Sequence, residues 1–373
     1  MTSENTSTSP TVMPPKFALD PGWAKIPDHL CLGDVSGVAL DEDGHVWIIH
    51  RYEMSDAGPR TPNKPAVKGH DGAPLTVDTA EDRTAAAAAA GKVPAPPVVE
   101  FDADGNYLRG WGGPGEGYEW PYMEHTMHVD HKGYVWLTSS KGDAPKGENQ
   151  ILKFTKDGEF VLQIGHRDQC TGSLDQNNVM GAADLYVHPA TNEIFVADGY
   201  RNRRVVVFDA DSGEFKRFWG AYGNVPDDDA PKGWGGYGEF GQQFHTVHGI
   251  RVSNDDLVYV CDRRNNRIQV FDLDGTFVAE EFYDRESKKV GTTFAIAFSP
   301  DEEQTFMYVP DASNGIVRVI ERKTLRELDH FGTFGDEPGQ FHYAHSIATD
   351  AKGNIYTTEV IFTQRIQKWI LQP

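Results

Sequence analysis

The chain is poor in cysteine, in long apolar runs and in positive charge. Three cysteines (Cys31, Cys170 and Cys261) among 373 residues are too few and too scattered for a disulfide framework or a thiolate metal site. No apolar run approaches the roughly 20 residues that span a bilayer, so we expect no membrane partner. Acidic residues outnumber basic ones by 56 to 35, and the net charge of −21 argues against a nucleic-acid partner, whose phosphates would be repelled. A small-molecule substrate remains compatible with this charge.

The start of the chain also lacks the features of an export signal. Residues 1–16 contain neither a basic segment nor an apolar core, and their composition predicts a disordered tail. Without such a signal, the expected location is the cytoplasm. Residues 17–373 are expected to form a single domain, with an insertion at about residues 52–97 that is rich in proline, glycine and alanine. An insertion of this length is either a lid over a site or an exposed excursion.

A repeated sequence motif, called a phrase below, accounts for most of the rest of the chain. Residues 245–271 contain three short alternating strands separated by turns, and a further hairpin follows, which together have the length of one propeller blade. The phrase occurs six times, and its first positions are Ser36, His125, Ala183, His248, Phe294 and His345. The sequence therefore predicts an all-β fold, a six-bladed β-propeller. We expect a strand from residues 17–33 to complete the last blade and cover its edge.

Histidine occupies the first position in alternate copies, as His125, His248 and His345. Equivalent positions on the inner strands of a propeller form a ring about the central axis. Three imidazoles from alternate blades therefore converge on one point and leave a further position open. This is the arrangement of a catalytic zinc or a similar divalent ion.

Three further polar residues follow the second strand of their copies. Arg51 follows copy one, Tyr200 copy three and Arg263 copy four, which places them on one rim of the channel. A phenol and two guanidinium groups beside a metal can move a proton and hold an anion. The aspartates that end second strands are expected instead to form structural bridges between blades: Asp198, Asp262 and Asp311.

These residues carry a resemblance to a known family. The chain resembles the peptidyl-α-hydroxyglycine α-amidating lyases, six-bladed propellers with NHL-type repeats, from about Val35 to Trp369. The matching motifs are Val35-Ser-Gly-Val-Ala-Leu-Asp, His50-Arg51, His125, Ala197-Asp-Gly-Tyr200-Arg-Asn-Arg-Arg, His248, Asp262-Arg263-Arg-Asn-Asn-Arg-Ile-Gln and His345. The resemblance implies that the three histidines hold zinc and that Tyr200 is the catalytic base. It also implies that Arg51 and Arg263 engage the substrate.

The resemblance further implies a calcium ion held by the backbone carbonyls of Val38 and Met127. The family has an aspartate directly after the third zinc histidine, whereas this chain has Ser346. The disulfide cysteines of the family are missing too, with Arg201 at the position of one of them. Their absence fits a protein that is not exported and disfavours a secreted peptide as substrate.

The expected function is cleavage of a carbinolamide, such as an N-acyl-α-hydroxyglycine, to an aldehyde (glyoxylate) and an amide. Two alternatives stay open, and the oligomeric state is not indicated. One alternative is a metal-dependent hydrolase or lactonase on the same scaffold. Such sites favour oxygen ligands for a hard cation, whereas three imidazoles suit zinc. The other is a non-catalytic NHL-repeat binding module, which has no need of a threefold histidine set.

Overall fold

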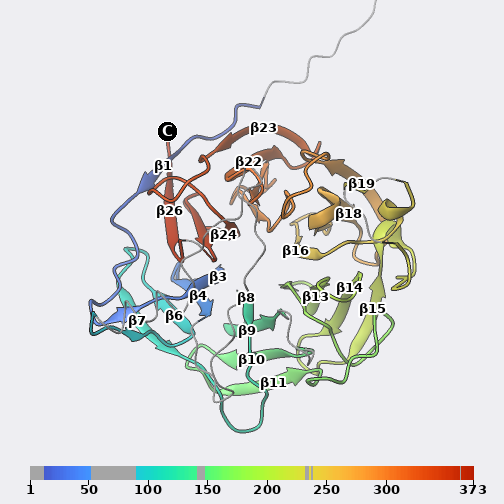
Figure 1. Cartoon of the computed structure of the whole chain (residues 1–373), viewed down its shortest axis with the longest axis horizontal. Helices are drawn as coiled ribbons and strands as arrows, with labels where there is room; N and C mark the ends of the chain where they lie inside the picture. The colour runs from blue at the N-terminus through green and yellow to red at the C-terminus, as the bar shows by residue number, and fades with distance from the viewer. Residues whose placement is uncertain (1–11, 52–89, 141–147, 232–234, 237, 362) are drawn as a thin grey trace, which may run out of the picture.

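The structure, a computed structural model, describes residues 12–51, 90–140, 148–231, 235–236, 238–361 and 363–373. Within these residues, six four-stranded antiparallel sheets surround a central axis, with one inner strand of each sheet next to that axis (Figure 1). The prediction of an all-β, six-bladed propeller is confirmed.

The blades follow the six predicted copies in order. Blade one contains β3 (Asp34–Leu40), β4 (Val46–Arg51), β6 (Val98–Phe101) and β7 (Tyr107–Trp111). Blade two contains β8 (Glu124–Val129), β9 (Tyr134–Ser139), β10 (Ile151–Thr155) and β11 (Phe160–Ile164). Blade three contains β12 (Asp184–His188), β13 (Glu193–Asp198), β14 (Arg204–Asp209) and β15 (Phe215–Trp219).

The other half of the ring has the same plan. Blade four contains β16 (Val247–Val252), β17 (Val258–Asp262), β18 (Arg267–Phe271) and β19 (Phe277–Phe282). Blade five contains β20 (Ala297–Phe298), β21 (Phe306–Asp311), β22 (Ile316–Glu321) and β23 (Arg326–Phe331). Blade six contains β24 (Ala344–Thr349), β25 (Ile355–Glu359), β26 (Ile366–Leu371) and, from the other end of the chain, β1 (Phe17–Asp20).

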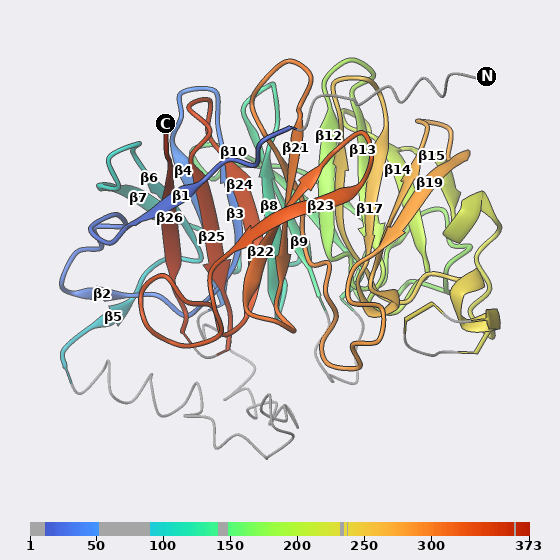
Figure 2. The same cartoon turned by 90° about the horizontal axis from the view of Figure 1, so that it is seen from above.

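The N-terminal strand closes the ring. Strand β1 pairs antiparallel with β26, with Phe17 opposite Leu371, and Figure 2 shows the two strands side by side. The closing strand was predicted within residues 17–33, and the structure places it at the beginning of that range. Trp23 has another role, because its ring packs against Phe101 and Tyr356 in the core between blades six and one. The expected closure is therefore confirmed.

Two predicted segments fall largely outside the described residues. The tail at residues 1–16 is described only from residue 12, and Lys16 pairs with Asp329. Of the insertion at 52–97, residues 52–89 are outside the description, including the part for which a lid was considered. Its end forms β5 (Val93–Pro94), which pairs with β2 (Leu30–Cys31). Among the described residues, no helix has the length and apolarity needed to cross a membrane.

The core lies between neighbouring blades, because the second strands of the blades, such as β4, β9, β13 and β17, bury both faces. Strand β13 shows the principle. Phe195 and Ala197 join the apolar cluster shared with blade four, whereas Ile194 and Val196 join the cluster shared with blade two. This period of two follows from the alternation of side chains along a strand. The sheets are thus stacked about the axis with their inner strands at the channel.

The buried aspartates at the ends of second strands do not bridge blades. Asp198 pairs with Arg204 at 2.9 Å and Asp262 with Arg267 at 2.9 Å, in each case within one blade. The reason is register, since each aspartate lies directly opposite its arginine on the third strand. Asp311 likewise pairs with Arg318 of its own blade, so the expectation of bridges between blades was wrong for all three aspartates. The structural role of the first two pairs stands, because both side chains of each pair are fully buried.

Candidate metal centre

The three predicted histidines meet in the central channel. His125 lies on β8, His248 on β16 and His345 on β24, the inner strands of alternate blades. One ring nitrogen of each lies within 4.8 Å of the others, and the side chains are buried. The repeat register thus brings together residues more than 200 positions apart in the sequence.

Backbone carbonyls orient all three rings. The Nδ1–H groups of His125, His248 and His345 donate hydrogen bonds of 2.5, 2.7 and 2.7 Å to carbonyl oxygens of the next blade. The acceptors are the first positions of copies three, five and one: Ala183, Phe294 and Ser36. With Nδ1 protonated, each Nε2 has a lone pair for a ligand. A hydrogen bond from the far nitrogen is also how proteins orient histidines that bind metal.

Tyr200 lies among these nitrogens. It follows β13, and its hydroxyl oxygen is 2.8 Å from Nε2 of His125 and 3.0 Å from Nε2 of His248. A hydroxyl has one hydrogen and can donate it to only one lone pair at a time. Three inward lone pairs and one hydrogen leave an excess of negative potential at the centre. A divalent cation fits this donor set, and nitrogen ligands favour zinc or a similar ion over calcium.

The three imidazoles are neutral at ordinary pH. Burial, and to a smaller extent the Arg51 guanidinium, lower the pKa of His345 to about 3. Burial likewise holds the pKa values of His125 and His248 well below the usual range, with smaller effects from neighbouring histidines and arginines. Metal ligation needs the neutral ring, so the environment favours the ligating form before any ion binds.

Both predicted arginines lie beside the triad. Arg51, at the end of β4, donates from Nε to the carbonyl of Glu124 at 2.6 Å. Arg263, which begins the 3-10 turn η3 (Arg263–Asn265), is 6% exposed, and its Nη1 is 3.5 Å from the Tyr200 hydroxyl. Neither forms an ion pair with an acidic side chain of the described residues. Two guanidinium groups without a carboxylate are suited to an anionic substrate group.

Two glycines make this arrangement sterically feasible. A Cβ on Gly199 would lie 2.1 Å from the backbone nitrogen and oxygen of Val247, so only glycine lets the Tyr200 loop approach β16. Gly291, at φ +107°, likewise allows close packing against Arg263, where a Cβ would lie 2.5 Å from the carbonyl oxygen. Sequence reasoning did not single out either glycine. The motif Asp-Gly-Tyr offered a signal for the first.

Sequence reasoning also missed what Phe294 does. Its carbonyl holds His248, and its ring lies 4.7 Å from the Arg263 guanidinium, which is a cation–π contact. The available signal was the repeat register. The copies without histidine contribute their backbone at the same position, so an apolar residue there has a site function that its side-chain chemistry does not indicate.

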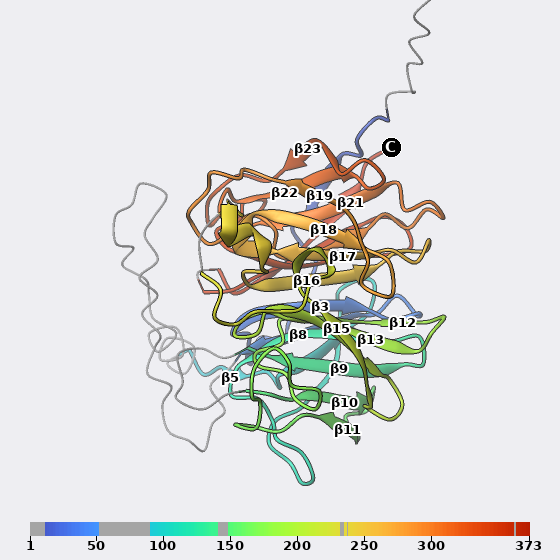
Figure 3. The ribbon, with the colours of Figure 1, turned by 90° about the vertical axis from the view of Figure 1, so that its right-hand side faces the viewer.

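The loop before inner strand β16 lies toward one face of the propeller. The 3-10 turns η1 (Ala221–Gly223) and η2 (Gly238–Gln242) and strand β5 lie toward the same face in Figures 2 and 3. His245 and then His248 follow η2 directly along the chain. The triad is therefore nearer to this face than to the opposite one.

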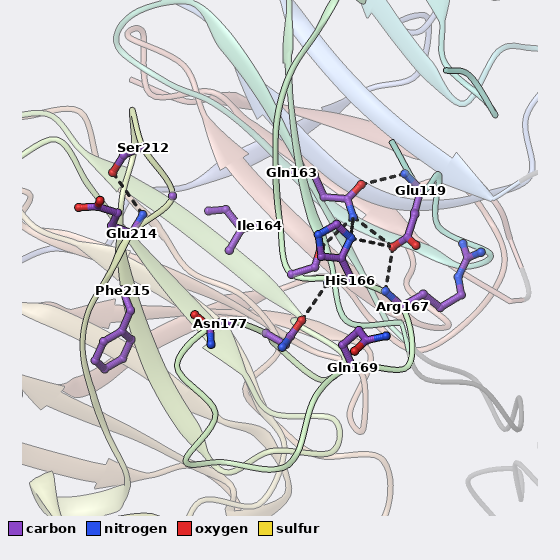
Figure 4. A pocket seen from close by; sticks show the side chains of 13 residues that line it. Glu119, Gln163, Ile164, His166, Arg167, Gln169, Asn177, Ser212, Glu214 and Phe215 are labelled. Atoms are coloured by element: carbon purple, nitrogen blue, oxygen red, sulfur yellow. Dashed lines mark hydrogen bonds and ion pairs between the residues drawn. The ribbon is translucent and has the colours of Figure 1, made fainter. Parts of the chain in front are cut away.

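A separate groove lies away from the channel, between blades two and three. It has a volume of about 670 Å³ and is lined mainly by polar side chains (Figure 4). Glu119, Gln163 and His166 point toward one another there, and Gln163 donates to both of the others. None of the predicted site residues lines this groove. A second set of potential ligands in the described chain consists of Asp41, His45 and Glu100. Asp41 pairs with Lys156 and accepts a hydrogen bond from Trp47 Nε1, whereas Glu100 pairs with Arg109 and is hydrogen-bonded to His45.

Comparison with known proteins agrees with this geometry. The NHL repeat family matches residues 244–271. Peptidylglycine alpha-amidating monooxygenase of Rattus norvegicus is 28% identical over 321 residues, covering 81% of this chain. A probable peptidyl-alpha-hydroxyglycine alpha-amidating lyase of Caenorhabditis elegans is 25% identical over 242 residues, covering 64% of it. The resemblance to amidating-lyase-like NHL propellers is confirmed.

The two relatives are longer than the part of them that this chain matches. The chain spans 28% of the length of the rat protein and 56% of that of the nematode protein. A solved streptogramin B lyase structure superposes with a TM-score of 0.51 at 14% identity, covering 95% of this chain and 98% of that one. At this identity the superposition supports the propeller fold alone. The chain is thus a propeller that is similar in sequence to NHL-repeat and amidating-lyase proteins, and its reaction is a separate question.

Proposed function

We propose that this protein is a metal-dependent lyase, with zinc as the metal, that cleaves the C–N bond of a carbinolamide. One observation carries the proposal: three neutral imidazoles converge on one point, the Tyr200 hydroxyl contacts two of them, and the two guanidinium groups nearby form no ion pair with a carboxylate of the described residues. His125, His248 and His345 are the residues that would hold the ion. When bound, a divalent ion supplies a Lewis acid that lowers the pKa of a hydroxyl group.

The substrate class follows from the surrounding groups. An N-acyl-α-hydroxyglycine has a hydroxyl, an amide nitrogen and a carboxylate on one carbon. Arg51 and Arg263 bind the carboxylate, since a guanidinium can hold both of its oxygens. Their charges also disfavour cationic or purely apolar compounds. The nematode relative, named as a peptidyl-alpha-hydroxyglycine alpha-amidating lyase, supports the same class.

Tyr200 moves the proton. In its deprotonated form it takes the proton of the substrate hydroxyl. The C=O bond of the aldehyde forms as the C–N bonding pair leaves with nitrogen. Tyr200 then returns the proton to that nitrogen, so the reaction needs no water and no redox partner. The products are glyoxylate and the free amide, and together they contain every atom of the substrate.

Incubating the zinc-loaded protein with a panel of N-acyl-α-hydroxyglycines and lactones tests the proposal. We expect glyoxylate, trapped as its hydrazone, and amide in equal amounts, with activity lost on chelation and restored by zinc. Opening of lactones without aldehyde release would favour the hydrolase. Absence of any turnover by the metal-loaded protein would favour the binding module. Either result would overturn the lyase assignment.

A further inference from the structure

A second polar layer lies in the channel beyond the histidines. Arg251, three residues after His248, forms an ion pair of 2.6 Å between its Nη1 and Asp184 Oδ2. The same carboxylate oxygen accepts a hydrogen bond of 3.1 Å from the backbone N–H of Ile250. Asp184 is 3% exposed, and its other oxygen, Oδ1, accepts no hydrogen bond from the described residues. Arg251 and Asp184 come from β16 and β12, the inner strands of adjacent blades.

Carbonyl oxygens also face this layer. Ile250 donates its N–H to Asp184 and accepts a 2.6 Å hydrogen bond from Arg251 Nη1, so both its backbone groups point to the open edge of β16. Ile250 is two residues after the first repeat position. Val38 and Met127 stand at the same place in copies one and two. Equivalent register therefore directs their carbonyls to the channel as well. These are the two carbonyls for which the family resemblance implied calcium.

The residues of this layer do not fit a calcium ion. Calcium in proteins needs several oxygen ligands, with carboxylates supplying the negative charge. The position after His345 holds Ser346, which is neutral. At the equivalent position of the six copies, the single acidic residue is Asp184, and it is already neutralised by Arg251. The positive charge that neutralises this carboxylate is therefore supplied by a side chain of the protein, Arg251.

We propose that the guanidinium of Arg251 takes the place of a calcium ion in the polar layer of the channel beyond the histidines, so that this propeller is stable without calcium. The guanidinium neutralises the Asp184 carboxylate and donates a hydrogen bond to the Ile250 carbonyl. A calcium ion would interact with the same two groups by coordination. The inference is independent of the proposed reaction, because neither residue contacts the triad or Tyr200 in the contacts described above.

Thermal melting with and without millimolar calcium, at constant saturating zinc, tests this proposal. For the unchanged protein we expect the same Tm in both buffers and no stoichiometric calcium by elemental analysis. Arg251→Met removes the charge and keeps most of the volume, leaving the Asp184 carboxylate unpaired. Its Tm is expected to fall by on the order of 5–10 °C and to rise again in part when calcium is added. Arg217→Met, which breaks an ion pair with Glu193 at the outer strand, is the control without a calcium response.

Three outcomes would overturn the proposal. The first is about one bound calcium, or a calcium-dependent Tm, in the unchanged protein. The second is an Arg251→Met variant that melts like the unchanged protein. The third is a destabilised variant that calcium does not stabilise, which would make the pair merely structural. If Arg251→Met does not fold, Arg251→Lys keeps the charge. It is expected to be independent of calcium, and a calcium response in it would contradict the account.

Discussion

At the scale of single residues, the Tyr200 hydroxyl contacts two of the three imidazoles, so one oxygen atom links the candidate metal centre to the proposed proton transfer. Tyr200→Phe removes that oxygen and keeps the ring. We expect kcat to fall by about 10²–10⁴-fold with KM and zinc content nearly unchanged, since the carboxylate and the metal are held by other residues. Steady-state kinetics on an N-acyl-α-hydroxyglycine, with metal analysis of the same sample, measure both.

Tyr186→Phe is the matched control, because this phenol also lies on an inner strand but is not in contact with the triad in the described structure. Its kinetics should resemble those of the unchanged protein. A Tyr200→Phe variant that retains kcat within a few-fold would remove the base from the mechanism and leave the metal assignment standing.

His50 links stability to pH. This buried ring accepts a hydrogen bond from the Gly33 N–H at Nδ1 (3.1 Å) and donates from Nε2 to the Pro96 carbonyl (3.0 Å). Burial lowers its pKa from 6.5 to about 4. The folded state therefore favours the neutral ring. Its contribution to stability is complete above pH 6.5 and is lost as the pH falls through about 4.

His50→Gln removes this titration and keeps an amide that can form hydrogen bonds. Between pH 7 and 4, the free energy of unfolding of the variant should fall by less than that of the unchanged protein, with a difference of about 3 kcal/mol. Denaturant unfolding of both proteins without metal gives this difference, since the triad histidines titrate equally in both. If the free energy of unfolding of the two proteins fell equally with pH, His50 would not be the source of the pH dependence.

At the scale of elements, one backbone group shows what the repeat predicts and what it does not. The N–H three residues before the first repeat position has a side-chain acceptor in every blade. The acceptors are His50, Glu148, Asp198, Asp262, Ser313 and Glu359. Burial makes the requirement common to all blades, but different side chains meet it. The fold was predictable from the shared register of the repeats. The acceptors of blades two and five, Glu148 and Ser313, do not stand at the repeat position that the other four acceptors share.

The same distinction holds at the site. The histidine triad was predictable because three equal residues stand at one register position, and Tyr200 and the arginines followed from their place after second strands. The carbonyls of Ser36, Ala183 and Phe294 were not recognised as the groups that orient the histidines. Any residue type has a backbone carbonyl, so the sequence does not indicate this function. The Arg251–Asp184 pair joins two different register positions of two blades, which no comparison of equivalent positions would reveal.

The closing strand β1 gives a prediction for an element. Its Phe17 packs against Tyr308 and Phe331, and the strand covers the edge of β26. Deleting residues 1–20 should therefore lower the Tm of the whole propeller by several degrees and promote association through the exposed edge. Deleting residues 1–14 is the control and should leave the Tm unchanged. Equal melting of the two truncations would show that β1 does not stabilise the ring.

At the scale of the whole molecule, closure of the ring is what creates the centre. Each histidine is held by a carbonyl of the following blade, and the bond from His345 to Ser36 joins the last blade to the first. The triad therefore depends on all six blades being in register. A strongly acidic chain thus keeps, at its axis, a small region whose nearest charged groups, among the described residues, are guanidinium groups.

The most direct test of the central claim is the metal content of the purified protein together with the ligands of that metal. Elemental analysis should give about one zinc per chain, and X-ray absorption should show three nitrogen ligands. His248→Ala should lose the ion, whereas the exposed His330→Ala should keep it. Full metal retention by His248→Ala, or a zinc-exposed protein that binds no metal, would contradict the account.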